Sequence, residues 1–203
     1  MNQNIPSKKE KRKDLLPQIY DLAELFIISI CIVLLLFSFG VRLCRVSGDS
    51  MLGTLHNGEL LLVSGGSQGV EKGDIIVFHQ TDEYNKKLNE PIVKRVIATE
   101  GEYVFIDYNT GTVYVSSDDK FDENDIINES YDYIDNNDGV ITSPYYAKDR
   151  IYHVPEGSVF VLGDNRNNSL DSRSDEIGYV DQRRILGKVQ IRLAPFSEFG
   201  KVE

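Results

Sequence analysis

Ser50 and Lys94 are the two residues of this chain that could together carry out nucleophilic chemistry. A serine hydroxyl attacks a carbonyl group efficiently only when a nearby base removes its proton, and a neutral lysine amine can act as that base. Ser50 lies in the segment from Val46 to Leu55, where Gly48 permits a tight turn and leaves room for a bound substrate. Most serines are surface or capping residues, so the assignment of Ser50 as a nucleophile depends on whether a base lies near it.

Lys94 lies in an apolar stretch that has the pattern of a strand. Period-two alternation places Ile92, Lys94 and Val96 on one face, with Arg95 on the opposite face, where we expect it to contribute little to the chemistry. Two interpretations stay open: the lysine stem extends to water, or the apolar face desolvates the amine. Desolvation would lower its pKa by several units from about 10.4 and make it a base.

A histidine base and a metal site are both disfavoured, because the three histidines lie in no motif and in no metal-ligand spacing: His56, His79 and His153. The segment 163–173 is dense in short polar side chains and carries Arg166 and Arg173. It is either a buried hydrogen-bond network, with the arginines pairing aspartates, or a polar turn.

An uncharged apolar run from Leu25 to Val41 precedes these residues. As a helix it would be about 26 Å long, near the short end of a bilayer crossing. A basic cluster from Lys8 to Lys13 precedes the run, which predicts a cytoplasmic N-terminus and an extracellular remainder. The alternative is a cleavable signal peptide, for which Ser38, Phe39 and Gly40 offer a small-residue pattern.

The remainder of the chain has the pattern of an all-β protein. Short β-branched or aliphatic segments alternate with Gly, Asp and Asn clusters, namely 59–64, 74–79, 91–99, 102–107, 112–116, 151–154, 158–162 and 185–193. Residues 116–139 contain nine acids and indicate an exposed insert, with a calcium loop at 135–139 as the alternative. The net charge of −10 argues against nucleic-acid binding.

Taken together, these segments resemble the type I signal peptidases, which use a serine–lysine dyad. The resemblance rests on five motifs that follow the anchor in the order of that family: Ser-Met-x-x-Thr-Leu at 50–55, Lys-Gly-Asp at 72–74, Lys94-Arg95, the polar segment 163–173 and Gly-Tyr-Val at 178–180. A single N-terminal anchor on a short chain is similar to the Gram-positive form.

The resemblance implies a β-rich, two-lobed catalytic domain behind one transmembrane helix. The corresponding division is a cytoplasmic tail at 1–21, an anchor at 22–43, a catalytic domain at 44–107 and 150–203, and an inserted acidic cap lobe at 108–149. The protein is then expected in the cell membrane as a single-pass protein, in contact with membrane lipid.

The resemblance also implies a role for each motif residue. Ser50 is the nucleophile and its backbone N–H serves the oxyanion, Lys94 is the general base, and Ser169 orients the lysine amine. The residues expected to form the scaffold of the site are Asp164, Asn165, Arg166, Asp171 and Arg173. Because the base is a lysine, no metal and no organic cofactor is implied.

Four positions differ from the family pattern. Gly53 stands where proline is usual, residues 99–102 replace a common Leu-Pro-Gly-Asp, Asn167 replaces a common Asp, and Gly48 offers no hydroxyl to the oxyanion. None of them is the nucleophile or the base, so they bear on substrate preference and local rigidity.

The implied substrates are exported preproteins with small side chains at the first and third positions before the cut. Segments 46–48 and 91–93 could hold the extended chain, and Met51, Ile92 and Val96 are the pocket candidates. One alternative is a non-catalytic signal-peptidase-like factor that binds or assembles exported surface proteins. A LexA-like self-cleaving protein is disfavoured, because it would carry a DNA-binding lobe and no anchor.

Overall fold

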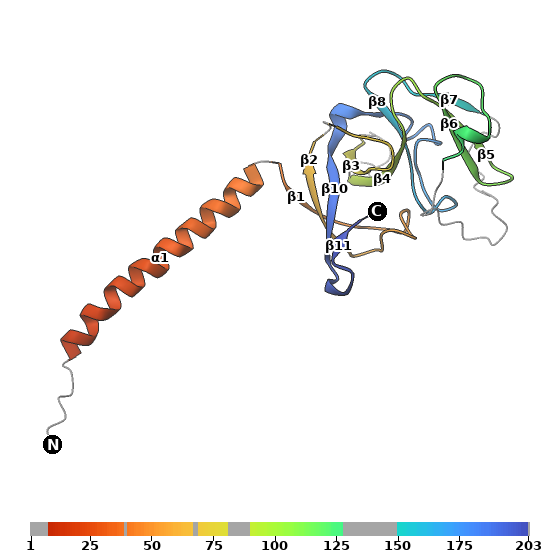
Figure 1. The fold of residues 1–203 in the computed structure, drawn as a ribbon. Coiled ribbons are helices and arrows are strands. Elements are labelled where there is room, and N and C mark those ends of the chain that lie inside the picture. The colour runs from red at the N-terminus through yellow and green to blue at the C-terminus, as the bar shows by residue number, and fades with distance from the viewer. Residues whose placement is uncertain (1–7, 39, 67–68, 81–89, 128–149, 203) are drawn as a thin grey trace. The chain divides into compact units, whose positions relative to one another are not determined.

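The computed structural model describes residues 8–38, 40–66, 69–80, 90–127 and 150–202. The chain divides into two compact units, Met1–Val41 and Arg42–Glu203 (Figure 1). Most of the expected acidic insert, including the 135–139 segment for which calcium was the alternative, lies outside the described residues.

The first unit is one long helix, α1 (Lys8–Ser38). Its segment Pro17–Leu35 has a mean hydropathy of 2.0 and is long enough to cross a membrane. Apolar side chains along this segment are exposed, as at Leu25 and Phe26. A helix that is apolar all round and covered by no other part of its unit suits a lipid surrounding.

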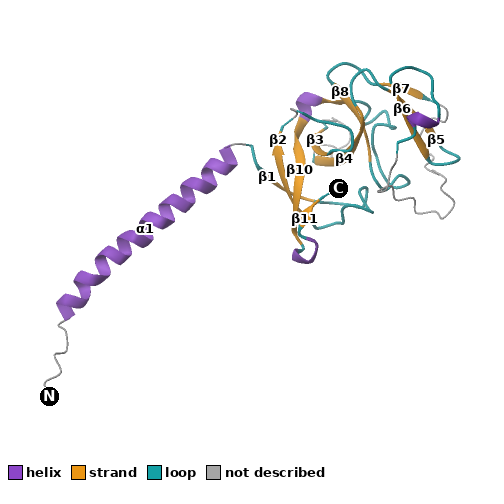
Figure 2. Cartoon of the chain, in the orientation of Figure 1, coloured by secondary structure: helices purple, strands orange, loops and turns teal. Residues whose placement is uncertain are grey.

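The regular elements of the second unit are almost all strands, joined by loops (Figure 2), so the all-β prediction is confirmed. Three short 3₁₀ turns, η2 (Glu123–Asp125), η3 (Gln182–Arg184) and η4 (Phe196–Glu198), are its helical elements in the described residues. Its strands are β1 (Arg42–Arg45), β2 (Leu60–Gly65), β3 (Ile75–His79), β4 (Pro91–Ala98), β5 (Tyr103–Asp107), β6 (Thr112–Ser116), β7 (Ile151–His153), β8 (Ser158–Leu162), β9 (Val180–Asp181), β10 (Ile185–Ala194) and β11 (Gly200–Lys201).

The larger sheet is antiparallel and runs in the order β1-β2-β10-β3-β4-β8-β9, with β11 paired to β10. β4 is therefore an interior strand: β3 pairs with it from Pro91 to Arg95, and β8 pairs with it only from Arg95 onward. Both faces of an interior strand can be covered, which is the condition for burying Lys94 and Arg95 side by side.

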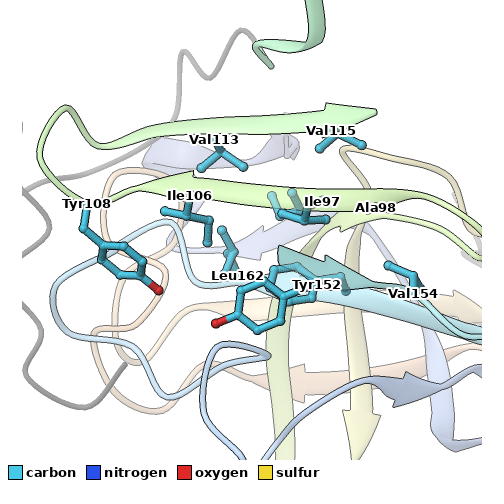
Figure 3. Packing of buried hydrophobic residues seen from close by; sticks show 11 residues of the cluster. Ile97, Ala98, Ile106, Tyr108, Val113, Val115, Tyr152, Val154 and Leu162 are labelled. Atoms are coloured by element: carbon cyan, nitrogen blue, oxygen red, sulfur yellow. The ribbon is translucent and has the colours of Figure 1, made fainter. Parts of the chain in front are cut away.

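The smaller sheet has the order β6-β5-β7 and packs against one end of β4 and β8. Figure 3 shows this shared core, in which Ile97 of β4 and Leu162 of β8 lie together with Ile106 and Tyr152 of the smaller sheet. Strands β5 and β7 fall outside the 108–149 range expected for the insert. The limits of that lobe stay a prediction.

Each strand expected from the alternation of residue types is present, within one or two residues at its ends. Three strands were not expected, namely β1, β9 and β11, which have four, two and two residues. Strands this short depend on pairing with distant partners, and local residue pattern gives little signal for them.

Candidate active site

Ser50 is half-buried in a tight turn that follows β1. Within this turn the Leu52 N–H donates to the Asp49 carbonyl at 3.2 Å, and the Leu55 N–H donates to the Met51 carbonyl at 2.7 Å. Met51 and Leu55 point into the core and are almost fully buried. The two core anchors hold the serine turn against the sheet.

Gly53 gives this turn a backbone conformation of its own. Its φ is +99°, in the region that favours glycine. A proline ring fixes φ near −65°, so the proline that is usual here could not take this conformation. The departure from the family pattern therefore has a structural basis.

Lys94 lies in the middle of β4, where its side chain is almost completely buried, with 4% exposed. Its Nζ donates to Ser50 Oγ at 2.7 Å and to the Val93 carbonyl at 3.0 Å. The amine thus lies within proton-transfer distance of a serine hydroxyl that is 44 residues away in the sequence.

The buried position changes the protonation of Lys94. Desolvation lowers the pKa of its amine from 10.5 to about 8. The charges of Asp171 and Asp164 act in the opposite direction, and the charge of Arg173 adds to the lowering. Near pH 8 the free site therefore contains a substantial fraction of the neutral amine that a base requires.

The start of the 163–173 segment docks against the serine turn. The Asn165 N–H donates to the Ser50 carbonyl at 3.1 Å, and Asn165 Nδ2 donates to the Asp49 carbonyl at 3.0 Å. A Cβ atom on Gly163 would lie 2.5 Å from the Ser50 carbonyl oxygen, so this close approach requires glycine. The contacts join the end of β8 to the serine turn.

Asp164 forms a fully buried ion pair with Arg95. Arg95 Nε and Nη2 donate to the two carboxylate oxygens at 2.9 and 2.8 Å, and Thr54 Oγ1 donates to the same carboxylate at 2.5 Å. Arg95 thereby ties the serine turn to the polar segment, which is a structural role, and the expectation that it contributes little to the chemistry stays a prediction. Arg95 and Thr54 are the functional residues that residue pattern missed, although both lie in the motifs behind the family resemblance.

Asp171 forms the second buried ion pair, with Arg173, whose Nε and Nη2 lie 2.8 Å from the two carboxylate oxygens. Charge and hydrogen bonds from Arg173, and a hydrogen bond from Ser169, hold the pKa of Asp171 below its usual value despite burial. Arg166 is fully buried, and its Nε donates to the Gly163 carbonyl. The expected role of Ser169 in orienting Lys94 stays a prediction.

A cleft of about 480 Å³ opens beside Ser50 and Lys94. Its walls come from the chain before the serine and from the first half of β4. The lining residues are Arg45, Val46, Ser47, Gly48, Ser50, Met51, Glu90, Pro91, Ile92, Val93 and Lys94.

Two of the three residues predicted to form the substrate pocket line the cleft, and the third does not. Met51 and Ile92 line the cleft, whereas Val96 is fully buried in the core and is not part of its lining. Val96 packs with side chains of β3 and β8, among them Ile76 and Val161. Val46 and Val93 are apolar lining residues that sequence reasoning did not assign to the pocket.

The three histidines lie outside this lining. His153 stacks on Tyr103 with 4.3 Å between the ring centroids, and His79 is exposed. His56 lies near Glu59 and Glu198, but Arg192 Nη1 donates to both carboxylates. A guanidinium already neutralises this acidic group, so we assign no metal to it.

Comparisons with known proteins agree with the geometry. The family model described as signal peptidase, peptidase S26, matches residues 19–194. Signal peptidase IB of Staphylococcus aureus is 35% identical over 194 residues, which cover 93% of this chain and 94% of that protein. A probable signal peptidase I-1 of Synechocystis is 33% identical over 209 residues, with 99% and 92% covered.

A solved structure of a signal peptidase I from Enterococcus faecalis is 28% identical to this chain. It covers 60% of this chain and 97% of its own, with a TM-score of 0.42.

Proposed function

This chain belongs to the signal peptidase (peptidase S26) family and is a membrane-anchored serine peptidase that removes signal peptides, and we propose that Ser50 is its nucleophile and Lys94 its general base. The observation that carries the proposal is the 2.7 Å separation of Lys94 Nζ from Ser50 Oγ inside a buried site. No histidine lines the cleft, which leaves the lysine amine as the base within reach.

In the proposed mechanism the neutral amine of Lys94 removes the hydroxyl proton of Ser50 as the oxygen attacks the scissile carbonyl. The resulting ammonium then protonates the leaving amine, so that the peptide bond breaks and an acyl-enzyme remains. The same amine next activates a water molecule, which hydrolyses the ester and regenerates Ser50. The backbone N–H of Ser50 stabilises the oxyanion of each tetrahedral intermediate.

We propose that the substrate lies in the cleft as an extended chain. From Pro91 to Val93, β4 pairs on one side with β3, and among the described strands nothing pairs with its other side before Arg95. An unpaired strand edge can accept an added substrate strand through main-chain hydrogen bonds. Met51 and Ile92 would then bound shallow apolar pockets that favour small side chains at the first and third positions before the cut.

The proposed orientation places the N-terminus in the cytoplasm and the catalytic unit outside. The support is the basic cluster 8–13 before the apolar span Pro17–Leu35. Single cysteines test it, once Cys31 and Cys44 have been replaced by serine. A membrane-impermeant maleimide should label Asn109→Cys in intact cells and label Asn4→Cys only after lysis. The reverse pattern would reject the orientation.

The catalytic assignment is tested by incubating the detergent-solubilised protein with a panel of preproteins and sequencing the new N-termini. The unmodified protein should cut after small residues, and Ser50→Ala and Lys94→Ala should lose cleavage while they keep the melting temperature of a folded protein. Substantial turnover by Lys94→Ala would reject the dyad. A panel left uncut by the unmodified protein would favour the non-catalytic alternative.

A further inference from the structure

We propose that Asn165 is a positioning residue that aims the backbone N–H of Ser50 at the oxyanion. The inference rests on the proposed role of Ser50 and adds a task for a side chain that otherwise counts only as scaffold. It follows from which main-chain groups Asn165 binds in the serine turn.

The peptide group between Asp49 and Ser50 determines the direction of the Ser50 N–H. In a trans peptide the C=O and the N–H lie in one plane and point in opposite directions. Asn165 Nδ2 donates to the Asp49 carbonyl at 3.0 Å, so the carbonyl side of this peptide faces Asn165. The N–H of Ser50 must then face the other way, and it donates to no residue in the described part of the chain.

A second bond limits rotation of the same unit. The backbone N–H of Asn165 donates to the Ser50 carbonyl at 3.1 Å. Asn165 therefore binds the carbonyl on each side of the Ser50 Cα atom. The Leu52 N–H also reaches the Asp49 carbonyl, but it belongs to the same turn and cannot fix that turn to the rest of the domain.

The other candidate donors of an oxyanion site are limited. Gly48 has no hydroxyl, and its backbone N–H is already bound to Asn57 Oδ1 at 3.1 Å. Ser47, which also lines the cleft, carries the hydroxyl of a second candidate donor. With so few candidates, the direction of the Ser50 N–H matters more than it would in a site with many donors.

The burial of Asn165 favours a functional interpretation. The residue is 3% exposed, and its Oδ1 has no hydrogen-bond partner among the described residues. The bond to Asp49 is thus the one that the buried amide makes through its side chain. A buried polar atom without a partner costs stability, so a dedicated role at the reacting site accounts for the asparagine better than folding alone.

The test uses the full-length protein in detergent with Asn165→Ala and with the isosteric Asn165→Asp, which lacks the N–H donor. The matched control is Asn168→Ala, an exposed asparagine of the same segment. Loss of an oxyanion donor typically costs about 10²- to 10³-fold in kcat, so we expect about 10- to 100-fold for a donor that is misaimed and not removed. KM should stay unchanged in both variants. The rising limb of kcat/KM set by Lys94 should stay in place in Asn165→Ala, which adds no charge, and Asn168→Ala should resemble the unmodified protein.

Two peptide inhibitors separate positioning from general damage. A peptide boronate, which forms a tetrahedral adduct with the serine, should lose affinity for both variants by the same factor as kcat. A reduced-amide peptide, which has no carbonyl at the scissile position, should bind within about threefold of its normal affinity, because only the transition state uses the aimed N–H.

Three outcomes would overturn the inference: unchanged kcat in both variants, equal loss of affinity for the two inhibitors, or loss of a cooperative melting transition in both variants while Asn168→Ala keeps it. A failure of the proposed function is distinguished by the unmodified protein. If Ser50 is not the nucleophile, mass spectrometry should find no boronate adduct on Ser50, whatever the result for the Asn165 variants.

Discussion

Lys94 Nζ lies 2.7 Å from Ser50 Oγ, and the amine that makes this contact is almost completely buried. The interior strand β4 supplies the burial, and the turn after β1 supplies the hydroxyl. Burial lowers the pKa of the amine to about 8, which turns an ordinary cation into a base.

A carboxylate beside the Lys94 amine should shift the pH dependence of kcat/KM to higher pH. Ile92 lies two residues before Lys94 on the same strand and lines the same cleft. The substitution Ile92→Asp would stabilise the ammonium, raise the pKa of Lys94 and shift the limb along which kcat/KM rises with pH upward by about one unit. Ile92→Asn is the control of equal size without charge, and its limb should stay in place. A limb that does not move in the aspartate variant would show that Lys94 is not the titrating group.

Lys94 should also lower the stability of the protein at neutral pH. Below pH 8 the amine is protonated in both states, and the folded state carries the desolvation penalty, about 3 kcal/mol for a pKa lowered from 10.5 to about 8. Between pH 8 and 10.5 the unfolded chain binds more protons, so the free energy of unfolding rises with pH. Lys94→Met should therefore be inactive yet more stable at pH 7, and its advantage should shrink toward pH 10.5. Thermal unfolding in detergent at several pH values checks this; a variant that is less stable at every pH would contradict it.

The buried Arg95–Asp164 pair should be expensive to break. Both side chains are at most 3% exposed, and removing one leaves the other charge buried without its partner. Arg95→Met or Asp164→Asn should lower the free energy of unfolding by roughly 3–5 kcal/mol. The surface pair of Lys72 and Glu102 is the comparison, since Lys72→Met should cost less than about 1 kcal/mol. Equal losses at the two pairs, measured by thermal unfolding, would count against the buried network.

Restoring the usual proline of the family should damage this protein. Gly53→Pro cannot keep a φ of +99°, so the serine turn must change its shape. We expect cleavage to fall more than about tenfold and the melting temperature to drop, with Gly53→Ala intermediate because alanine tolerates this region at a smaller cost. Full activity of the proline variant would mean that the turn adopts another conformation in solution.

The alternation of residue types predicted the strands correctly where the strands are long enough to show a period. Alternation located β4 and placed Ile92 and Lys94 on one face, and Gly and Asp clusters located the ends of the longer strands. The strands β1, β9 and β11 were missed because two to four residues carry no clear period, and their existence depends on pairing with β2, β8 and β10.

The site could be predicted only in part, because its contacts cross large sequence distances. Nothing near Arg95 in the sequence indicates that Asp164 will arrive from β8 to pair with it, 69 residues later. Alternation also placed Val96 beside Lys94, but it could not indicate that Val96 would pack into the core with side chains of β3 and β8. The serine and lysine themselves were paired through family resemblance, since local pattern left the lysine open to a simple surface role.

Direct titration of the Lys94 amine decides whether this residue acts as a neutral base. Lysines can be labelled with ¹³C at the ε carbon, and the Lys94 signal identified as the one missing in Lys94→Met. Its titration in the uncomplexed protein should give a pKa near 8, and kcat/KM should rise with pH along a limb of the same value. A Lys94 amine that titrates near 10.5, while the rate limb lies elsewhere, would contradict the serine–lysine mechanism.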